Sequence, residues 1–326
     1  MQAGIMPNSI QYDTGSMSAF LDAGKYNAVF YGEHHNTTFD PEIKYHLIKH
    51  LNSSYGFRHV FMEVGISAAW RYTQYLNTGD TSWLVNPTLV MTKGGYGFFW
   101  KRLYEYNQLL PDSQRIIIHG IDFERTEIFS TLLMLSGQDS IPPSLIAIND
   151  TLKAHMNDSP LVIYTIRQGK LALLNDEVPF NKTIQYIRKA FEKNEVASKA
   201  YFGKNYQLAM YMLHNPGVAM LYPKPRNKTM AMLMQNVLEK ERVTKFIGFF
   251  GHTHTDYSVA TALTNFIAKQ QNYKHSTTLT IMEVVKDDNE GLSQPGCKAI
   301  ITPAAAIPAL KRKADFLLIT NNGNKE

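Results

Sequence analysis

Ionisable side chains stand at the ends of four short apolar runs that lie far apart in the sequence. One run ends in a Glu-His-His triplet, and another is followed by a His-Thr-His triplet. The set comprises Glu33, His34, His35, Glu63, Asp122, His252 and His254. A glutamate beside a histidine raises the pKa of the imidazole toward neutrality, which suits proton transfer. These residue types therefore indicate acid–base chemistry, provided that the fold brings them together.

The apolar runs themselves predict buried β-strands, because they are short and rich in β-branched and aromatic residues. They are residues 27–33, 58–65, 115–122, 245–252, 277–285 and 315–320. Helix-like stretches lie between them, as in residues 40–51 and 226–240. This alternation predicts an α/β fold with a central, mainly parallel sheet flanked by helices. Because the carboxyl ends of parallel strands share one edge, we expect the polar strand ends to form one site.

Strand geometry predicts which members of the set face the same way. Successive side chains of a strand point to opposite faces, so we expect only one of His34 and His35 to face the site. By the same two-residue period, His252 and His254 share a face, and both could enter the site. His119 and Glu124, which belong to the third strand end, are weaker candidates.

The chain as a whole, residues 1–326, is predicted to form a single α/β domain. Its middle part, about residues 126–215, consists mainly of helix-like segments and is predicted to form a helical insertion or cap. The aromatic stretch of residues 94–100 is a candidate lining for a substrate cleft, although core packing is the commoner role of such residues.

Composition and charge restrict the partners. The net charge is +5, but the basic residues are scattered and lack the density of a nucleic-acid-binding arm. No apolar run approaches the roughly 18 residues of a membrane span, and no secretory signal is visible. The single cysteine, Cys297, allows no intrachain disulfide. We expect a small-molecule substrate, no nucleic-acid or membrane partner, and a cytoplasmic location by default with export left open.

Three chemistries fit the residues at the strand ends. Glu33, Glu63, Asp122 and some of the histidines could bind zinc or a similar cation, although the His-x-His spacing alone is a weak signal. Ser67, Asp122 and His252 follow the chain order of a serine-hydrolase triad. A histidine that takes a proton from water, with a carboxylate to orient it, needs no metal and no strict spacing.

The motifs also resemble those of a known family. They are GEHH (32–35), GFRHVFMEVG (56–65), GID (120–122), RNKTMAMLMQNV (226–237) and GHTHTD (251–256). Taken in this order, they resemble the erythromycin esterase family, which belongs with haem-binding ChaN-like proteins in one α/β superfamily. The resemblance covers about residues 28–264 and implies an α/β fold with hydrolase activity on ester bonds.

The resemblance also implies roles for individual residues. His35 matches the catalytic general base, while Glu63 matches a glutamate that assists the water or the histidine. Glu33 matches the first family glutamate, and the late histidines match a pair that stabilises the oxyanion. Lys44 falls where the family has an arginine, and Asp122 and Arg226 match structural or site-supporting positions. His34, beside His35, is a further candidate for substrate binding. Three positions depart from the family pattern: Glu-His-His replaces Glu-x-x-His, Lys44 replaces an arginine, and the late motif is His-x-His.

The sequence thus predicts a hydrolase that cleaves an ester or related acyl bond in a small organic molecule, with water activated by histidine and glutamate. No cofactor is expected. The alternatives are a haem- or metal-binding protein without catalysis, and a metal-dependent hydrolase that uses the same side chains as ligands.

Overall fold

The computed structural model describes most of the chain in separate stretches. These are residues 10–11, 23–33, 40–85, 96–136, 140–158, 164–167, 170–173, 177–215, 223–269, 277–286, 299–303 and 314–321. They fall into two compact units. The first contains residues 1–63, 72–121 and 223–326, and the second contains residues 64–71 and 122–222.

The first unit is built on one sheet, whose strands occur in the order β1-β9-β10-β8-β2-β7-β3-β4. The strands are β1 (Ile10–Gln11), β2 (Ala28–Glu33), β3 (His59–Met62), β4 (Ile117–Gly120), β7 (Phe246–Gly251), β8 (Thr278–Lys286), β9 (Ala299–Pro303) and β10 (Phe316–Asn321). Every neighbouring pair from β10 to β4 is parallel, while β9 pairs antiparallel with β10 and with β1. The predicted mainly parallel α/β sheet is therefore confirmed, and all six predicted strands belong to it.

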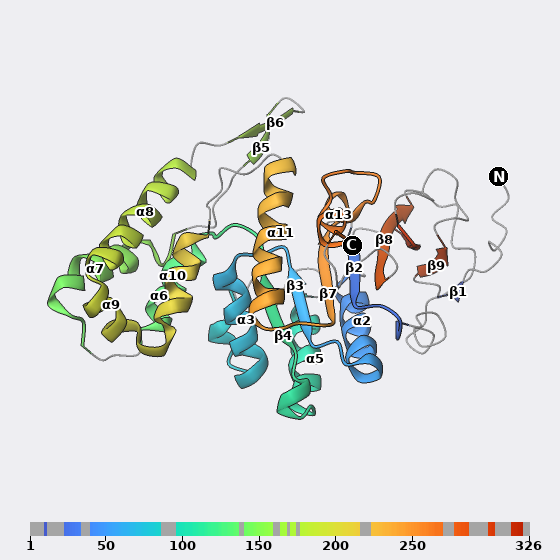
Figure 1. Cartoon of the computed structure of the whole chain (residues 1–326), viewed down its shortest axis with the longest axis horizontal. Helices are drawn as coiled ribbons and strands as arrows, with labels where there is room; N and C mark the ends of the chain where they lie inside the picture. Colours follow the sequence, from blue (N-terminus) through green and yellow to red (C-terminus); the bar gives the residue numbers. More distant parts are fainter. Residues whose placement is uncertain are drawn as a thin grey trace. The chain divides into compact units, whose positions relative to one another are not determined.

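Helices flank this sheet in the first unit (Figure 1). They are α2 (Asp40–Tyr55), α5 (Tyr96–Gln108), α11 (Pro223–Lys240), α12 (His252–Thr255) and α13 (Leu263–Ile267), with short 3-10 turns at Thr81–Trp83 and Asp112–Gln114. Helix α3 (Ile66–Thr78) begins in the second unit and ends in the first. No helix in the described stretches is both long and apolar enough to cross a membrane.

Aromatic side chains fill the core between the sheet and its helices. The β7 sequence FIGFFG is buried along its whole length. Phe30 of β2 packs edge-on against Phe246, with ring centroids 5.5 Å apart, and Phe61 of β3 packs against the same ring at 5.2 Å. A Cβ atom at Gly248 would lie 2.4 Å from the Phe250 ring, so only glycine fits there. This packing holds the ends of β2, β7 and β3 in fixed register.

The second unit is mainly helical. It contains α6 (Glu127–Leu135), α7 (Ile146–His155), α8 (Glu177–Lys193), α9 (Glu195–Phe202) and α10 (Tyr206–His214), with 3-10 turns at Pro143–Leu145 and Gly203–Asn205. The sequence predicts helices throughout this region. It does not predict the antiparallel hairpin of β5 (Tyr164–Arg167) and β6 (Lys170–Leu173).

Candidate active site

Glu63 is the centre of a polar cluster at the carboxyl end of β3. It directly follows the strand, and its side chain is 15% exposed. Arg226 Nη2 donates to Glu63 Oε1 at 2.6 Å, and the backbone N–H of Gly251 donates to Oε2 at 2.8 Å. His254 Nε2 lies 3.4 Å from Oε1. Segments far apart in the sequence, from β3, α11 and the end of β7, therefore meet at one carboxylate.

These contacts keep Glu63 ionised. Burial by itself raises the pKa of a carboxyl, but the hydrogen bond and charge of His254, the charge of Arg226 and the Gly251 N–H outweigh it. The pKa of Glu63 therefore lies well below its usual range. A carboxylate that holds its charge so strongly is a poor proton acceptor and a good orienting group.

The ring of His254 is held from its other side by Asn227. His254 is 6% exposed, and its Nδ1 contacts Asn227 Oδ1. Asn227 Nδ2 donates to the carbonyl of Thr261 at 2.7 Å, which leaves Oδ1 to face the ring. Because an amide oxygen accepts, Nδ1 carries a proton and Nε2 is the nitrogen that faces Glu63. The sequence gives no signal for Asn227, which is one ordinary polar residue in α11.

The expected shared strand face of His252 and His254 is wrong. Strand β7 ends at Gly251, and residues 252–255 form the helical turn α12. His254 is buried, whereas His252 is partly exposed. The turn packs on the end of β2 so closely that a Cβ at Gly32 would collide with the side chain of Thr255. Gly32 is therefore required for the approach of the histidine turn to the Glu33 strand end.

A second polar cluster surrounds Lys44 of α2. Its amine forms ion pairs with Glu33 and with Asp40, the latter at 2.6 Å, and only 6% of the residue is exposed. Tyr96 donates to Asp40 at 3.0 Å, and its hydroxyl lies 3.4 Å from the Lys44 amine. Burial lowers the pKa of a lysine, but Asp40 and Glu33 outweigh it here, so the pKa of Lys44 is raised well above its usual value.

The two clusters lie at neighbouring strand ends. Glu33 is the register partner of Gly251 across the parallel β2–β7 pair. The N–H of Gly251 in turn binds Glu63, and β7 pairs with β3. Glu33, Lys44, Glu63, Arg226 and His254 thus gather at one sheet edge. Tyr96, from the aromatic stretch of residues 94–100, and Asp40 also join this edge, and Asp40 has no strand-end signal because it begins a helix.

The buried tyrosine Tyr31 lies close to this edge. Burial raises its pKa, and the charges of Glu283, Asp40 and Glu33 raise it further. Glu283 comes from β8 and is 2% exposed, so it is a further buried carboxylate beside β2. Neither residue stood out in the sequence, because each lies inside an apolar strand.

Other predicted residues are placed elsewhere. His34 and His35 lie outside the described residues. Asp122 is buried in the second unit, where its carbonyl accepts from Asn215 Nδ2 at 2.8 Å. His119 pairs with His59 in the first unit, at a distance of 2.9 Å between ring nitrogens. Phe99 and Trp100 from the aromatic stretch are core residues.

The serine nucleophile has no support in the geometry. Ser67 is fully buried in the first turn of α3, and its hydroxyl donates to Glu124. Glu124 also accepts from the N–H of Ile66 at 2.8 Å, so this carboxylate caps the helix. Burial raises the pKa of Glu124 to about 7, although the Ser67 hydroxyl opposes the shift. A hydroxyl locked in this way is not free to attack a substrate.

Comparison with solved structures defines the class of fold. No family model matches the sequence, and no curated protein matches it in sequence. A Bacillus cereus protein is 12% identical, covers 94% of this chain and 91% of its own, and superimposes with a TM-score of 0.57. A succinoglycan biosynthesis protein is 13% identical, with coverages of 92% and 88% and a TM-score of 0.55. The chain therefore shares the α/β fold of these proteins.

The same fold occurs in an erythromycin esterase. A mutant of the esterase EreC in its open conformation is 12% identical, covers 91% of each chain and has a TM-score of 0.55. This likeness agrees with the resemblance that the sequence motifs carry. At 12% identity, the comparison shows that the two proteins share a fold.

Proposed function

We propose that the protein hydrolyses an ester or related acyl bond in a small organic molecule, using water activated by histidine. The observation that carries the proposal is the chain of contacts Asn227–His254–Glu63–Arg226 at the edge where the β2 and β7 ends meet. It combines an ionised carboxylate, an oriented imidazole and a guanidinium at one place. The esterase-like fold supports the same reading.

Each residue has a distinct part in the proposed reaction. His35 takes a proton from water as the water oxygen attacks the acyl carbon. Glu63 orients the water or the histidine, which fits its ionised state. His252 stabilises the oxyanion of the tetrahedral intermediate, while His254, whose two ring nitrogens contact Asn227 and Glu63, holds Glu63 in place. The intermediate then collapses, the bond to the leaving oxygen breaks, and the His35 imidazolium returns its proton to that oxygen.

Lys44 is assigned a positioning role instead of direct contact with substrate. Its amine is enclosed by Glu33, Asp40 and the Tyr96 hydroxyl. It therefore fixes Glu33 at the end of β2, directly before the two histidines. No part in the reaction is assigned to Asp122, whose backbone carbonyl accepts from Asn215 within the second unit.

The first test is a panel of esters and lactones, macrolides included, with wild type, His35→Ala and Glu63→Gln. We expect activity that survives a chelator, disappears in His35→Ala and falls by roughly 100-fold or more in Glu63→Gln, since groups that orient a proton transfer contribute on this scale. His50→Ala, a change on α2 away from the site, is the matched control and should retain full activity.

Other outcomes would separate the alternative functions. Full turnover in His35→Ala would contradict the assignment of the base. Activity lost on chelation and restored by one cation would favour metal-dependent hydrolysis. A Soret band in the purified protein, without turnover of any ester, would favour a haem-binding protein.

A further inference from the structure

A separate polar cluster lies at the opposite end of β3 from Glu63. It consists of His59, His119 and Glu241. His59 is the first residue of β3 and precedes Glu63 by four residues, which corresponds to about 13 Å along a strand. His119 is the third residue of β4, and Glu241 follows the end of α11. The candidate active site uses none of these side chains.

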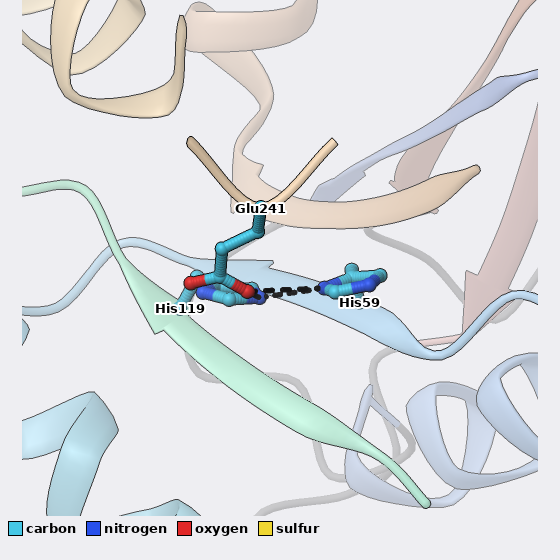
Figure 2. A group of neighbouring side chains, drawn as sticks. All are labelled: His59, His119 and Glu241. Atoms are coloured by element: carbon cyan, nitrogen blue, oxygen red, sulfur yellow. Dashed lines mark hydrogen bonds and ion pairs between the residues drawn. The ribbon is translucent and has the colours of Figure 1, made fainter. Parts of the chain in front are cut away.

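Three potential ligand atoms converge in this cluster. The Nδ1 of His59 and the Nε2 of His119 are 2.9 Å apart, and each lies 3.9 Å from Oε2 of Glu241. Figure 2 shows the two rings on adjacent strands and the Glu241 carboxylate directed toward their facing nitrogens. His119 also stacks on Phe61, with ring centroids 4.8 Å apart, which holds its ring in place.

The facing nitrogens of the two rings lie within hydrogen-bond distance of each other. Two neutral rings can share only one proton between their facing nitrogens. The Glu241 carboxylate faces the same point, and a divalent cation there would satisfy all three groups.

We propose that His59, His119 and Glu241 bind one zinc ion. Two imidazole nitrogens and one carboxylate oxygen form a ligand set used by zinc, with water in the fourth position. Magnesium and calcium prefer oxygen ligands, so a site with two imidazoles does not suit them. Ligands of a tetrahedral zinc lie about 3.4 Å apart, given bonds of about 2.0–2.1 Å. The separations of 2.9, 3.9 and 3.9 Å lie on both sides of this value.

The surroundings are compatible with such a site. The side chains of His59 and His119 are 13% and 7% exposed, whereas that of Glu241 is 41% exposed, so water can reach the fourth position from the side of Glu241. Two cations, Arg58 and Lys240, lie near the cluster and weaken the attraction for a cation. Arg58 donates to the Ser113 carbonyl at 2.6 Å, and Lys240 is solvent-exposed, so water screens the lysine charge.

Zinc at this position would join three parts of the first unit. It would link the start of β3 to β4 and to the turn that follows α11. Because the ion would bind the folded chain through groups that are dispersed after unfolding, it would raise the melting temperature in a concentration-dependent way. Hydrolysis at the other sheet edge does not depend on it, so the two proposals succeed or fail separately.

The experiment is a zinc titration of the full-length chain, purified without a polyhistidine tag. Zinc affinity is measured by competition with a chromophoric chelator, and bound zinc is counted by elemental analysis after gel filtration. We expect one zinc per chain and a rise in melting temperature with added zinc. His119→Gln and His59→Ala should each weaken binding by roughly 100-fold or more, since even residues that only support a ligand cost 10–100-fold. Glu241→Gln should weaken it by at least about 10-fold.

Two controls decide where any zinc is bound. His254→Ala removes a histidine of the candidate active site, and His50→Ala removes one from the α2 surface. Both variants should bind zinc like wild type. The proposal is overturned if wild type binds no zinc, if His119→Gln and His59→Ala bind as tightly as wild type, or if only His254→Ala loses zinc. Circular dichroism and the zinc-free melting temperature show whether a variant is folded, and His119→Gln is included because it fills the space of the ring.

Discussion

The amide of Asn227 determines how the His254 ring is presented to Glu63. Its two polar atoms have different partners, the Thr261 carbonyl on one side and the imidazole on the other. Asn227 is 1% exposed, so both contacts lie away from bulk solvent. The single residue therefore fixes the orientation of a site histidine and accepts the hydrogen bond from its Nδ1.

Asn227→Ala should lower the free energy of unfolding by about 1–3 kcal/mol, because the buried Nδ1–H of His254 loses its acceptor. It should also change the pH profile of hydrolysis, since His254 is then free to turn. The matched control is Asn107→Ala, which removes another buried asparagine that joins Leu76 to Ile116. Denaturant unfolding should show both losses, whereas only the Asn227 variant should change the pH profile. An unchanged profile would remove Asn227 from the site.

The sequence identified some site residues better than others. Glu33 and Glu63 could be predicted because each ends a strongly apolar run, and a parallel sheet brings such ends to one edge. Asp40 and Asn227 could not, since they are polar residues in helices, where such residues usually face solvent. The two-residue period misplaced His252 because it assumed that the strand continued beyond Gly251.

The turn after α11 contains a residue with a strained backbone conformation. Arg242 has a φ of 52°, and the Val243 N–H closes the helix end on the Leu238 carbonyl. This is the position after a helix where glycine is usual, because a Cβ atom is disfavoured in the left-handed region. The strained residue directly follows Glu241, whose carboxylate faces the histidine pair.

Arg242→Gly should raise the free energy of unfolding by about 0.5–1 kcal/mol, because the left-handed conformation costs glycine little. Val243→Gly, one residue further along, is the control, and it should destabilise the protein because Val243 is buried. Thermal and denaturant unfolding of both variants measure the two effects. A loss of stability in Arg242→Gly would mean that the arginine side chain contributes more than its backbone strain costs.

Elements were predicted as far as their apolar content allowed. The six parallel strands read as apolar runs, and β2 and β7 are buried along almost their whole length. Strand β1 has only two residues, which is too short for a pattern. Strands β5 and β6 include charged residues such as Arg167 and Lys170, so they do not form apolar runs. Helices α2 and α11 extend a few residues beyond the predicted ranges, since apolar spacing does not define where a helix ends.

At the scale of the whole molecule, the division of the chain depends on contacts that no local pattern reveals. Residues 64–71 belong with residues 122–222. Glu124 binds the N–H groups of Ile66 and Ser67 across nearly sixty residues of sequence. The sequence predicts the helical character of the middle segment, but a single carboxylate that caps a distant helix leaves no periodic signal.

Glu124 also gives the second unit a pH dependence. Burial raises its pKa to about 7 in the folded chain, whereas an unfolded glutamate titrates near its ordinary value of about 4.3. Between these two values the folded state binds more protons than the unfolded state, so stability decreases as the pH rises through this window. The full difference is about 3–4 kcal/mol and is reached above pH 7. Glu63 in the first unit has the opposite sign: its stabilisation is present above its unfolded pKa and is lost as the pH falls.

Glu124→Gln should therefore remove the contribution of Glu124 to the decrease in stability between about pH 4.5 and pH 7, while Glu127, whose pKa is also raised by burial, keeps its own contribution. The glutamine oxygen can still accept from the N–H groups of Ile66 and Ser67, and the uncharged amide has no proton to lose. The control is Glu195→Gln, an exposed residue in the same unit that pairs only with Lys199 at 2.8 Å among the contacts of the described chain. Differential scanning calorimetry at pH 5 and pH 7.5 compares both variants with wild type. The contrary result is a melting temperature that falls equally in wild type and Glu124→Gln between the two pH values. It would show that the buried carboxyl titrates as it does in the unfolded chain. Glu124 would then not cause the pH dependence of the second unit.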